Sequence, residues 1–165
     1  MEYSRLFEAL YKSDIKYLIC GGLAVNIYGI PRMTADIDLI IEFEKENIDT
    51  FLKIIKTQDY HQLIPVPLTE LLDPQKRKQL VDEKNLIAYS FYNSNSAHMN
   101  LDVIVDFPET FENLWSRKEI RNIDNFKVNL LSLEDLIMIK EKTKREQDRE
   151  DVKLLSKILN EKKGL

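Results

Sequence analysis

The 165-residue sequence has little of several features that define whole classes of protein. A single cysteine, Cys20, excludes an internal disulfide and a cysteine-based zinc site, and its apolar surroundings predict a small core residue. No apolar run approaches the roughly 20 residues that a membrane-spanning helix needs. The N-terminal stretch MEYSRLFEAL is amphipathic and acidic, which does not fit a secretory signal. We therefore expect a cytoplasmic protein without membrane contact.

Positive charge is not in excess either. The chain has 24 lysines and arginines against 28 aspartates and glutamates, which gives a formal net charge of -4. Binding to extended nucleic acid needs a basic surface that neutralises phosphates, so we do not expect it here. A single phosphorylated ligand at a local basic spot stays compatible with this balance.

Apolar spacing divides the sequence into strand-like and helix-like segments. Short β-branched or alternating runs predict strands over residues 16–20, 37–43, 86–92, 99–105 and 126–130. Apolar residues at helical spacing predict helices over residues 3–11, 22–28, 48–55, 107–115, 133–144 and 152–159. Residues 61–84 contain three prolines and many charges, and predict only loop and short helix.

Strands interleaved with helices, together with a hairpin, predict an α+β (mixed α/β) fold with a central sheet flanked by helices. The length fits one domain with a sizeable core. Within it we expect a core over residues 1–131 and a C-terminal helical segment over residues 132–165 that packs on this core.

Four glycines are few for this length, yet two stand together in CGGLAVNIYGIPRMTADIDLI, residues 20–40. Gly21 and Gly22 lie between a predicted strand and a predicted helix, where glycine lets backbone N–H groups approach an anion closely. A glycine pair also serves any tight turn, so this signal is weak by itself. Its position one short helix before a pair of aspartates makes it more specific.

Asp36 and Asp38 share one face of the predicted strand, with their Cα atoms about 6.6 Å apart. Like charges this close repel unless a cation lies between them, and Mg²⁺ prefers oxygen ligands. Asp102 has the same placement on the strand over 99–105 and joins the pair if the two strands are neighbours. Three carboxylates can hold two metal ions for phosphoryl chemistry. A solvated strand end is the ordinary alternative for each of them.

These residues resemble the signature of the DNA polymerase β-like nucleotidyltransferase superfamily, hG[GS]…D-x-[DE]…D. The stretch GGLAVNIYGIPRMTADIDL and the tail LSLEDLIMIKEKTKREQDREDVKLL are similar to small prokaryotic nucleotidyltransferases related to abortive-infection and toxin–antitoxin systems. The resemblance implies that Gly21 and Gly22 hold a nucleoside triphosphate. It further implies that Asp36 and Asp38 bind Mg²⁺, and that Asp102 completes the metal site and orients or deprotonates the acceptor. Two ions are expected with bound nucleotide, and Mn²⁺ is a possible substitute.

Three further residues are candidates for nucleotide binding. Arg32 precedes the carboxylates in a loop, where it either neutralises a triphosphate or is a surface residue. Thr34 is a nucleotide contact by the resemblance and a backbone cap by its local sequence. Lys140 lies on the inner stripe of its helix and either extends to solvent or reaches a phosphate. Residues 145, 148 and 151 are expected to begin the final helix, with Asp148 as its cap.

The reaction that the resemblance implies is transfer of a nucleoside monophosphate from an NTP to a hydroxyl, with release of pyrophosphate. The acceptor is left open among a protein side chain, a tRNA end and a small molecule. One alternative is an inactive nucleotide-binding module that acts through a protein partner such as a toxin. Another is a structural protein whose carboxylates are exposed strand ends.

Overall fold

The computed structural model describes residues 3–164, with the side chains of residues 97 and 98 left out. Within this part the helices are α1 (Ser4–Lys12), α2 (Gly21–Ile27), α3 (Lys45–Thr57), the 3₁₀ helix η1 (Leu68–Leu72), α4 (Pro74–Lys84), α5 (Phe111–Ser116), α6 (Leu133–Glu141) and α7 (Glu146–Lys162). The strands are β1 (Tyr17–Cys20), β2 (Asp36–Ile41), β3 (Tyr60–Gln62), β4 (Ala88–Asn93), β5 (Ser96–Ile104), β6 (Glu119–Ile123) and β7 (Phe126–Leu130).

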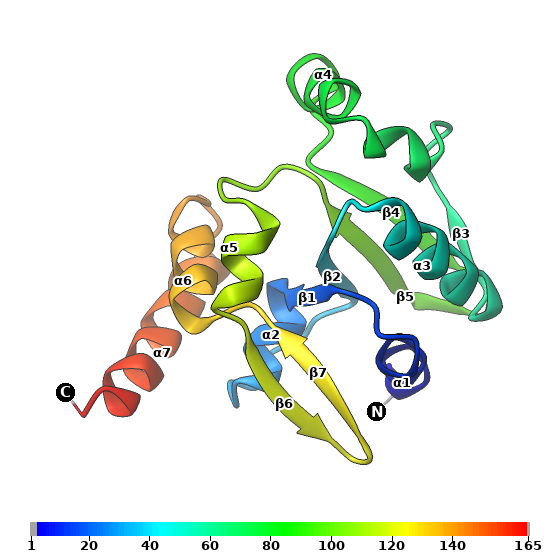
Figure 1. Cartoon of the computed structure of the whole chain (residues 1–165). Helices are drawn as coiled ribbons and strands as arrows, with labels where there is room; N and C mark the ends of the chain where they lie inside the picture. The colour runs from blue at the N-terminus through cyan, green and yellow to red at the C-terminus, as the bar shows by residue number, and fades with distance from the viewer. Residues whose placement is uncertain (1–2, 165) are drawn as a thin grey trace.

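The strands form one mixed sheet in the order β3-β4-β5-β2-β1-β7-β6 (Figure 1). β2 pairs in parallel with β5, and β1 in parallel with β7, while the remaining neighbours are antiparallel. The predicted mixed α/β class is confirmed. β1 and β2 lie at the centre, so the sheet brings together strands from both halves of the sequence.

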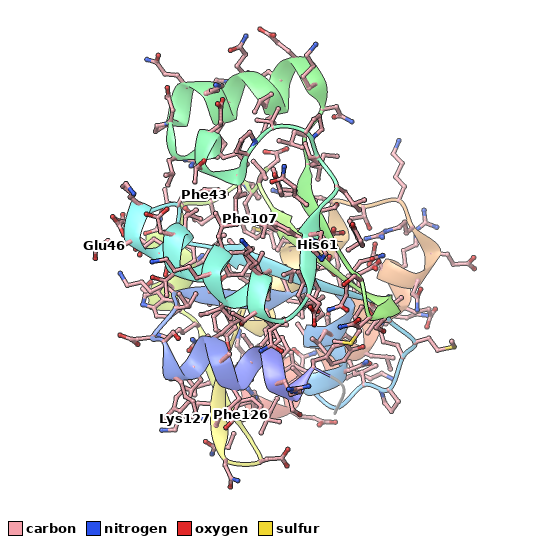
Figure 2. The ribbon with its side chains drawn as sticks, turned by 90° about the vertical axis from the view of Figure 1, so that its right-hand side faces the viewer. Phe43, Glu46, His61, Phe107, Phe126 and Lys127 are labelled. Atoms are coloured by element: carbon pink, nitrogen blue, oxygen red, sulfur yellow. The ribbon has the colours of Figure 1, made fainter. Side chains whose placement is uncertain are left out.

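The two faces of the sheet differ in character. On the central strand β2, Ile37 and Leu39 are fully buried, while Asp36 and Asp38 alternate with them on the other face and are half-buried. Met99 on β5 lies on the same face of the sheet as Ile37, and it lines a pocket together with residues of α1 and α3. Figure 2 shows α1 and α3 side by side in front of the sheet on this face. The carboxylates therefore lie on the opposite face, toward α6 and α7.

The structure differs from the sequence prediction between residues 60 and 85. α4 is a full helix although none of its residues is buried, so it lacks the apolar stripe that predicts helices. Its ends explain it: Asp73 accepts hydrogen bonds from the N–H groups of residues 75 and 76, Pro74 takes the first position, and Asn85 ends the helix in the left-handed conformation. The Cζ of Arg77 lies 4.6 Å from the centroid of the Phe43 ring, a cation–π contact that holds α4 against the rest of the protein.

Two short strands were also absent from the prediction. β3 has only three residues. β6 is an edge strand in which Ile120 is 51% exposed, while its half-buried positions hold Glu119, Arg121 and Ile123. Both hold their place through backbone pairing with β4 and β7. Edge strands of this kind carry no apolar alternation, which is why the sequence does not predict them.

The C-terminal helices begin with a capped turn. Ser132 accepts a hydrogen bond from the N–H of Asp135, as its place before α6 predicts. The predicted boundary between core and helical segment falls between β7 and α6, and the division itself stays a prediction. Among the described residues no helix has the length and apolar character needed to cross a membrane.

Candidate active site

The three predicted carboxylates come together on the two central parallel strands. Asp38 on β2 lies directly opposite Asp102 on β5, and Asp36 lies opposite Asn100. Directly paired residues point to the same side of a sheet, so the three carboxylates share one face. The neighbouring strand β4 adds Ser90, which lies opposite Asp102 and donates a hydrogen bond to its carboxylate.

The clustering changes the acidity of the site. Burial, the charge of Asp102 and then the charge of Asp36 raise the pKa of Asp38 to about 6. Burial also raises the pKa of Asp102, against the hydrogen bond from Ser90, which lowers it. Two carboxyl groups that resist ionisation because of burial and of nearby like charges are stabilised as carboxylates by a cation. The electrostatics therefore favour a positive ligand at this place.

The glycine pair makes room for these side chains. Gly21 has a φ of +61°, and a Cβ there would lie 2.8 Å from the Cβ of Asp38 and still closer to its carboxylate. A Cβ on Gly22 would lie 2.7 Å from the Oγ1 of Thr34 and 3.2 Å from the Cζ of Arg32. The N–H of Gly22 also hydrogen-bonds to Asp38. The backbone at the glycine pair thus lies against a site carboxylate, at the place where we expect it to approach a phosphate.

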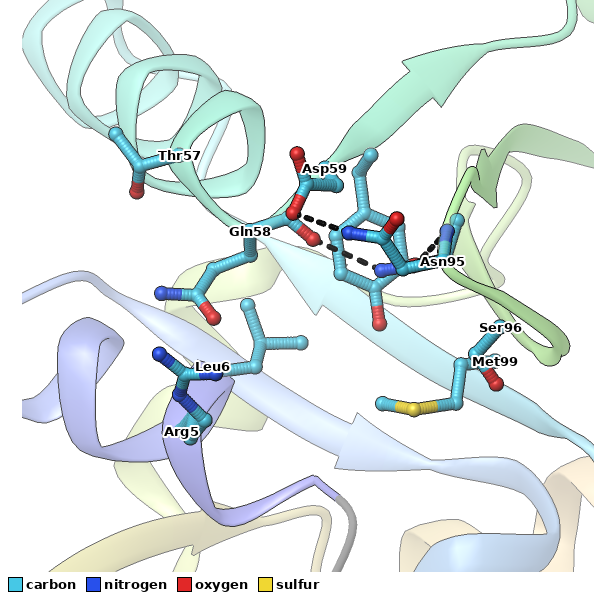
Figure 3. A pocket seen from close by; sticks show the side chains of 10 residues that line it. Arg5, Leu6, Thr57, Gln58, Asp59, Asn95, Ser96 and Met99 are labelled. Atoms are coloured by element: carbon cyan, nitrogen blue, oxygen red, sulfur yellow. Dashed lines mark hydrogen bonds between the residues drawn. The ribbon is translucent and has the colours of Figure 1, made fainter.

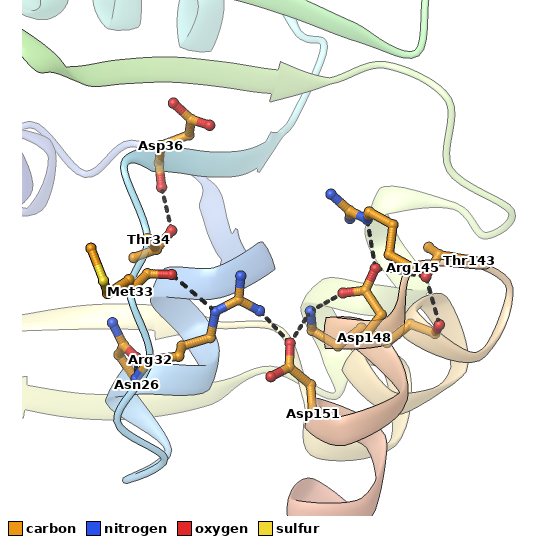
Figure 4. Close-up of polar contacts among 10 residues, drawn as sticks. Asn26, Arg32, Met33, Thr34, Asp36, Thr143, Arg145, Asp148 and Asp151 are labelled. Carbon is orange, nitrogen blue, oxygen red and sulfur yellow. Dashed lines mark hydrogen bonds and ion pairs between the residues drawn. The ribbon is translucent and has the colours of Figure 1, made fainter.

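Arg32 and Thr34 lie beside the glycines, on the loop that leads into β2. Thr34 donates a hydrogen bond to the carbonyl of Asp36 at 3.3 Å, which matches the local cap that its sequence predicted. Arg32 is 17% exposed at its side chain and forms an ion pair with Asp151 of α7 (Figure 4). The loop before the carboxylates is therefore connected to the C-terminal helix by a largely buried charge pair.

Lys140 is neither on the surface nor free. Its side chain is 6% exposed, and its ammonium lies 2.7 Å from both Asp148 and Asp151. The positive charge of Lys140 lowers the pKa of Asp38, so it acts on the carboxylate site through space. Together with Arg32, these residues form a charge network that joins α6 and α7 to the loop before β2 (Figure 4).

The prediction that Asp148 caps the final helix is wrong. α7 begins at Glu146 after Arg145, which makes no side-chain cap, and Asp148 lies in the first turn. Its carboxylate is buried, and it accepts hydrogen bonds from Lys140 (2.7 Å), Thr143 (2.6 Å) and Arg145 (2.7 Å), which offset the cost of burying a charge. Although burial alone would raise the pKa of Asp148, the hydrogen bonds from Lys140 and Thr143 lower it to about 2.

A cleft of about 230 Å³ lies between the carboxylate face and the C-terminal helices. Gly21 and Asp38 contribute to it from the sheet side, and Lys140 and Arg145 from the helices. Its remaining wall is mostly apolar and comes from α6, from the end of β5 and from residues 106–108 after it, with the carboxylates of Asp106 and Asp148 as further polar groups. Cys20 also lines the cleft but is only 4% exposed, and burial raises its pKa well above the ordinary value. The prediction that it is a core residue is confirmed.

A second pocket, of about 190 Å³, lies on the other side of the sheet (Figure 3). The turn after α3 and the turn between β4 and β5 form its rim. There Asn95 donates a hydrogen bond to Asp59 at 2.7 Å, and Asn93 donates one to the carbonyl of Gln58 at 2.8 Å. These polar groups satisfy one another, and none of the predicted site residues is among its lining.

The carboxylate face fits a hard divalent cation by its chemistry. Its donors are oxygens, their charges repel one another, and the pKa of Asp38 is raised. In residues 3–164 no three acidic, histidine or cysteine side chains are close enough to hold a metal ion by themselves. Mg²⁺ commonly takes one or two protein carboxylates and completes its shell with phosphate oxygens and water.

Sequence reasoning missed two members of this region. Ser90 lies in a strand whose alternation was recognised, but its pairing with Asp102 depends on which strand lies beside β5. For Arg145 we predicted only a structural role at the start of the helix, because the sequence does not reveal the cleft that this residue lines. No single pattern in the sequence reports either contact.

The mixed sheet, with a carboxylate pair on one strand and a third carboxylate on the parallel neighbour, is the arrangement of a polymerase β-like nucleotidyltransferase. Comparison with protein-family models agrees with this class. Residues 3–161 match the family described as nucleotidyltransferase of unknown function (DUF6036). The chain belongs to this family, and it is accordingly a transferase.

Solved structures share the fold. The antibiotic-resistance factor ANT(2'')-Ia in solution is 14% identical with a TM-score of 0.59, over 96% of this chain and 83% of the other. Its crystal structure with adenylyl-2''-tobramycin gives the same identity and TM-score over 96% and 88%. The lincomycin-bound lincosamide antibiotic adenylyltransferase LnuA is 14% identical with a TM-score of 0.59, over 92% of each chain. No match was found among curated protein sequences.

Proposed function

We propose that the protein transfers a nucleoside monophosphate from an NTP to a hydroxyl group in a Mg²⁺-dependent reaction. The observation that carries this proposal is the register of the central strands, which places Asp38 directly opposite Asp102 and beside Asp36. Mg²⁺ bound by Asp36 and Asp38 would neutralise these carboxylates and the phosphate oxygens of the nucleotide. Family membership supports the reaction class.

The other residues have distinct roles in this proposal. Asp102 orients the acceptor hydroxyl and takes its proton, and its raised pKa suits a base that must accept one. The acceptor oxygen forms a bond to the α-phosphorus while the bond from that phosphorus to the bridging oxygen breaks. Pyrophosphate leaves with the electrons of that bond.

Nucleotide binding is assigned to the glycine pair and to the residues around it. The absence of side chains at Gly21 and Gly22 lets the carboxylate of Asp38 and the hydroxyl of Thr34 lie close to the backbone. Arg32 and Lys140 contribute positive charge from the network that holds α6 and α7 against this loop. Because both side chains are paired with aspartates, they act on the phosphates mainly through their electrostatic field and by holding α6 and α7 in place.

The acceptor is a hydroxyl compound whose class the test must reveal. The structural neighbours bind adenylyl-2''-tobramycin and lincomycin, so small antibiotics are among the acceptors to be tried. A tRNA end and a protein side chain are the other two classes.

Thermal unfolding with each NTP, with and without Mg²⁺, tests the nucleotide site before the acceptor is known. Only ligands that prefer the folded state raise the melting temperature. We expect at least one NTP to stabilise the wild-type protein with Mg²⁺, and Asp36→Asn to abolish this stabilisation. Asp49→Asn, which alters an exposed ion pair on α3, is the matched control and should retain it. No NTP effect on the wild type would refute the proposal.

A further inference from the structure

Among the described cations around the cleft, Arg145 is the most exposed and makes the fewest polar contacts within the protein. Arg32 and Lys140 are mostly buried, and each is paired with one or two aspartates of α7. The side chain of Arg145 is 78% exposed and lines the same cleft as Gly21 and Asp38. In the described part of the chain only its Nε has a hydrogen-bond acceptor.

That single hydrogen bond fixes the direction of the guanidinium group. The Nε donates to Asp148 at 2.7 Å, and Asp148 is itself held by Lys140 and Thr143 and is 3% exposed at its side chain. Figure 4 shows the guanidinium projecting beyond Asp148, away from the body of α7. A buried carboxylate thus presents the two terminal amino groups of Arg145 as an open fork.

An open guanidinium fork binds a phosphate through two charge-assisted hydrogen bonds. The cleft contains Asp38 but neither Asp36 nor Asp102, so it extends away from the carboxylates where the α-phosphate reacts. The anionic part of an NTP beyond that point consists of the β- and γ-phosphates. We infer that Arg145, presented by Asp148, binds the pyrophosphate half of the nucleotide and stabilises it as the leaving group.

This inference rests on the proposed function but is tested separately from it. Magnesium pyrophosphate is the probe, because its binding does not depend on the base or the acceptor. We expect Arg145→Gln to raise its dissociation constant about tenfold or more, as the loss of a charge-assisted contact predicts. Arg145→Lys, which keeps the charge but not the fork, should give an intermediate value.

Arg149 provides the matched control. It lies one turn further along α7, is exposed and does not line the cleft, so Arg149→Gln removes the same charge without the fork. We expect this variant to bind magnesium pyrophosphate within about twofold of the wild type. The nucleoside monophosphate of the preferred NTP should bind wild type and Arg145→Gln equally.

Three results would overturn the inference. They are unchanged pyrophosphate binding in Arg145→Gln, an equal loss in Arg149→Gln, and an equal loss for the nucleoside monophosphate. Failure of the proposed function looks different, because the wild-type protein would then show no Mg²⁺-dependent stabilisation by any NTP. Melting temperatures of all variants, measured without ligand, show whether each one is folded.

Discussion

Replacing Gly21 by alanine separates two consequences of a methyl group in the active site. Gly21 has a φ of +61°, a left-handed conformation that costs a non-glycine residue about 1–2 kcal/mol. The new Cβ would also lie 2.8 Å from the Cβ of Asp38 and closer still to its carboxylate, so Asp38 must move. Overpacking of this kind adds about 1–3 kcal/mol.

Gly29 is the matched control because it has the strain without the contact. Its φ is +101°, and an added Cβ would have nothing within 4 Å. We expect Gly29→Ala to lose about 1–2 kcal/mol of unfolding free energy and to keep its response to nucleotide. Gly21→Ala should lose about 2–5 kcal/mol in total, the sum of strain and overpacking.

The assay is urea unfolding of both variants, followed by thermal unfolding with Mg²⁺ and the preferred NTP. Each additional kcal/mol should lower the melting temperature by about 2–4 °C for a chain of this size. Gly21→Ala should also lose nucleotide stabilisation, because its Asp38 is displaced. Equal stability of the two variants, with nucleotide binding retained in Gly21→Ala, would refute the assignment of Gly21 as the space for Asp38.

Two further predictions concern the charge network. Lys140→Met leaves the buried Asp148 and Asp151 without their shared cation, so it should lower the free energy of unfolding in urea by about 3–5 kcal/mol. Lys142→Met, at an exposed neighbouring position, is the control and should be near neutral. If Lys140→Met lost no more stability than this control, the charge network would be contradicted. The pKa of Asp148 is lowered from 3.8 to about 2, so its ionised form stabilises the protein above pH 3.8, and this stability is lost as the pH falls toward 2. Lys140, Thr143 and Arg145 face this carboxylate, and Asp151 shares Lys140 with it. Asp148→Asn should therefore flatten the acid limb of a stability–pH curve, and an unchanged slope over this range would count against the ion pairs.

The carboxylate site was predictable because each of its parts has a local pattern. The period of two in β2 places Asp36 and Asp38 on one face, and the same rule orients Asp102 on β5. What the sequence cannot provide is the pairing of β2 with β5, since these strands are separated by α3, η1, α4 and two other strands. The resemblance to a known family supplied this missing adjacency.

The remaining differences have a common physical origin in long-range contacts. The position of the glycine pair was predictable, but its contact with Asp38 depends on how β1 pairs with β2. Lys140 was ambiguous because its partners, Asp148 and Asp151, approach only after α7 folds back on α6. α4 was missed because it is stabilised by its caps and not by an apolar stripe.

Isotope transfer tests the central claim most directly. The protein is incubated with Mg²⁺ and with α-labelled or γ-labelled NTP, in the presence of separated protein, RNA and small-molecule fractions of a cell extract. The account predicts that label from the α-phosphate enters one fraction, that label from the γ-phosphate is released in pyrophosphate, and that Asp38→Ala does neither. Transfer of the γ-label, transfer unaffected in Asp38→Ala, or no transfer of either label to any fraction would contradict it.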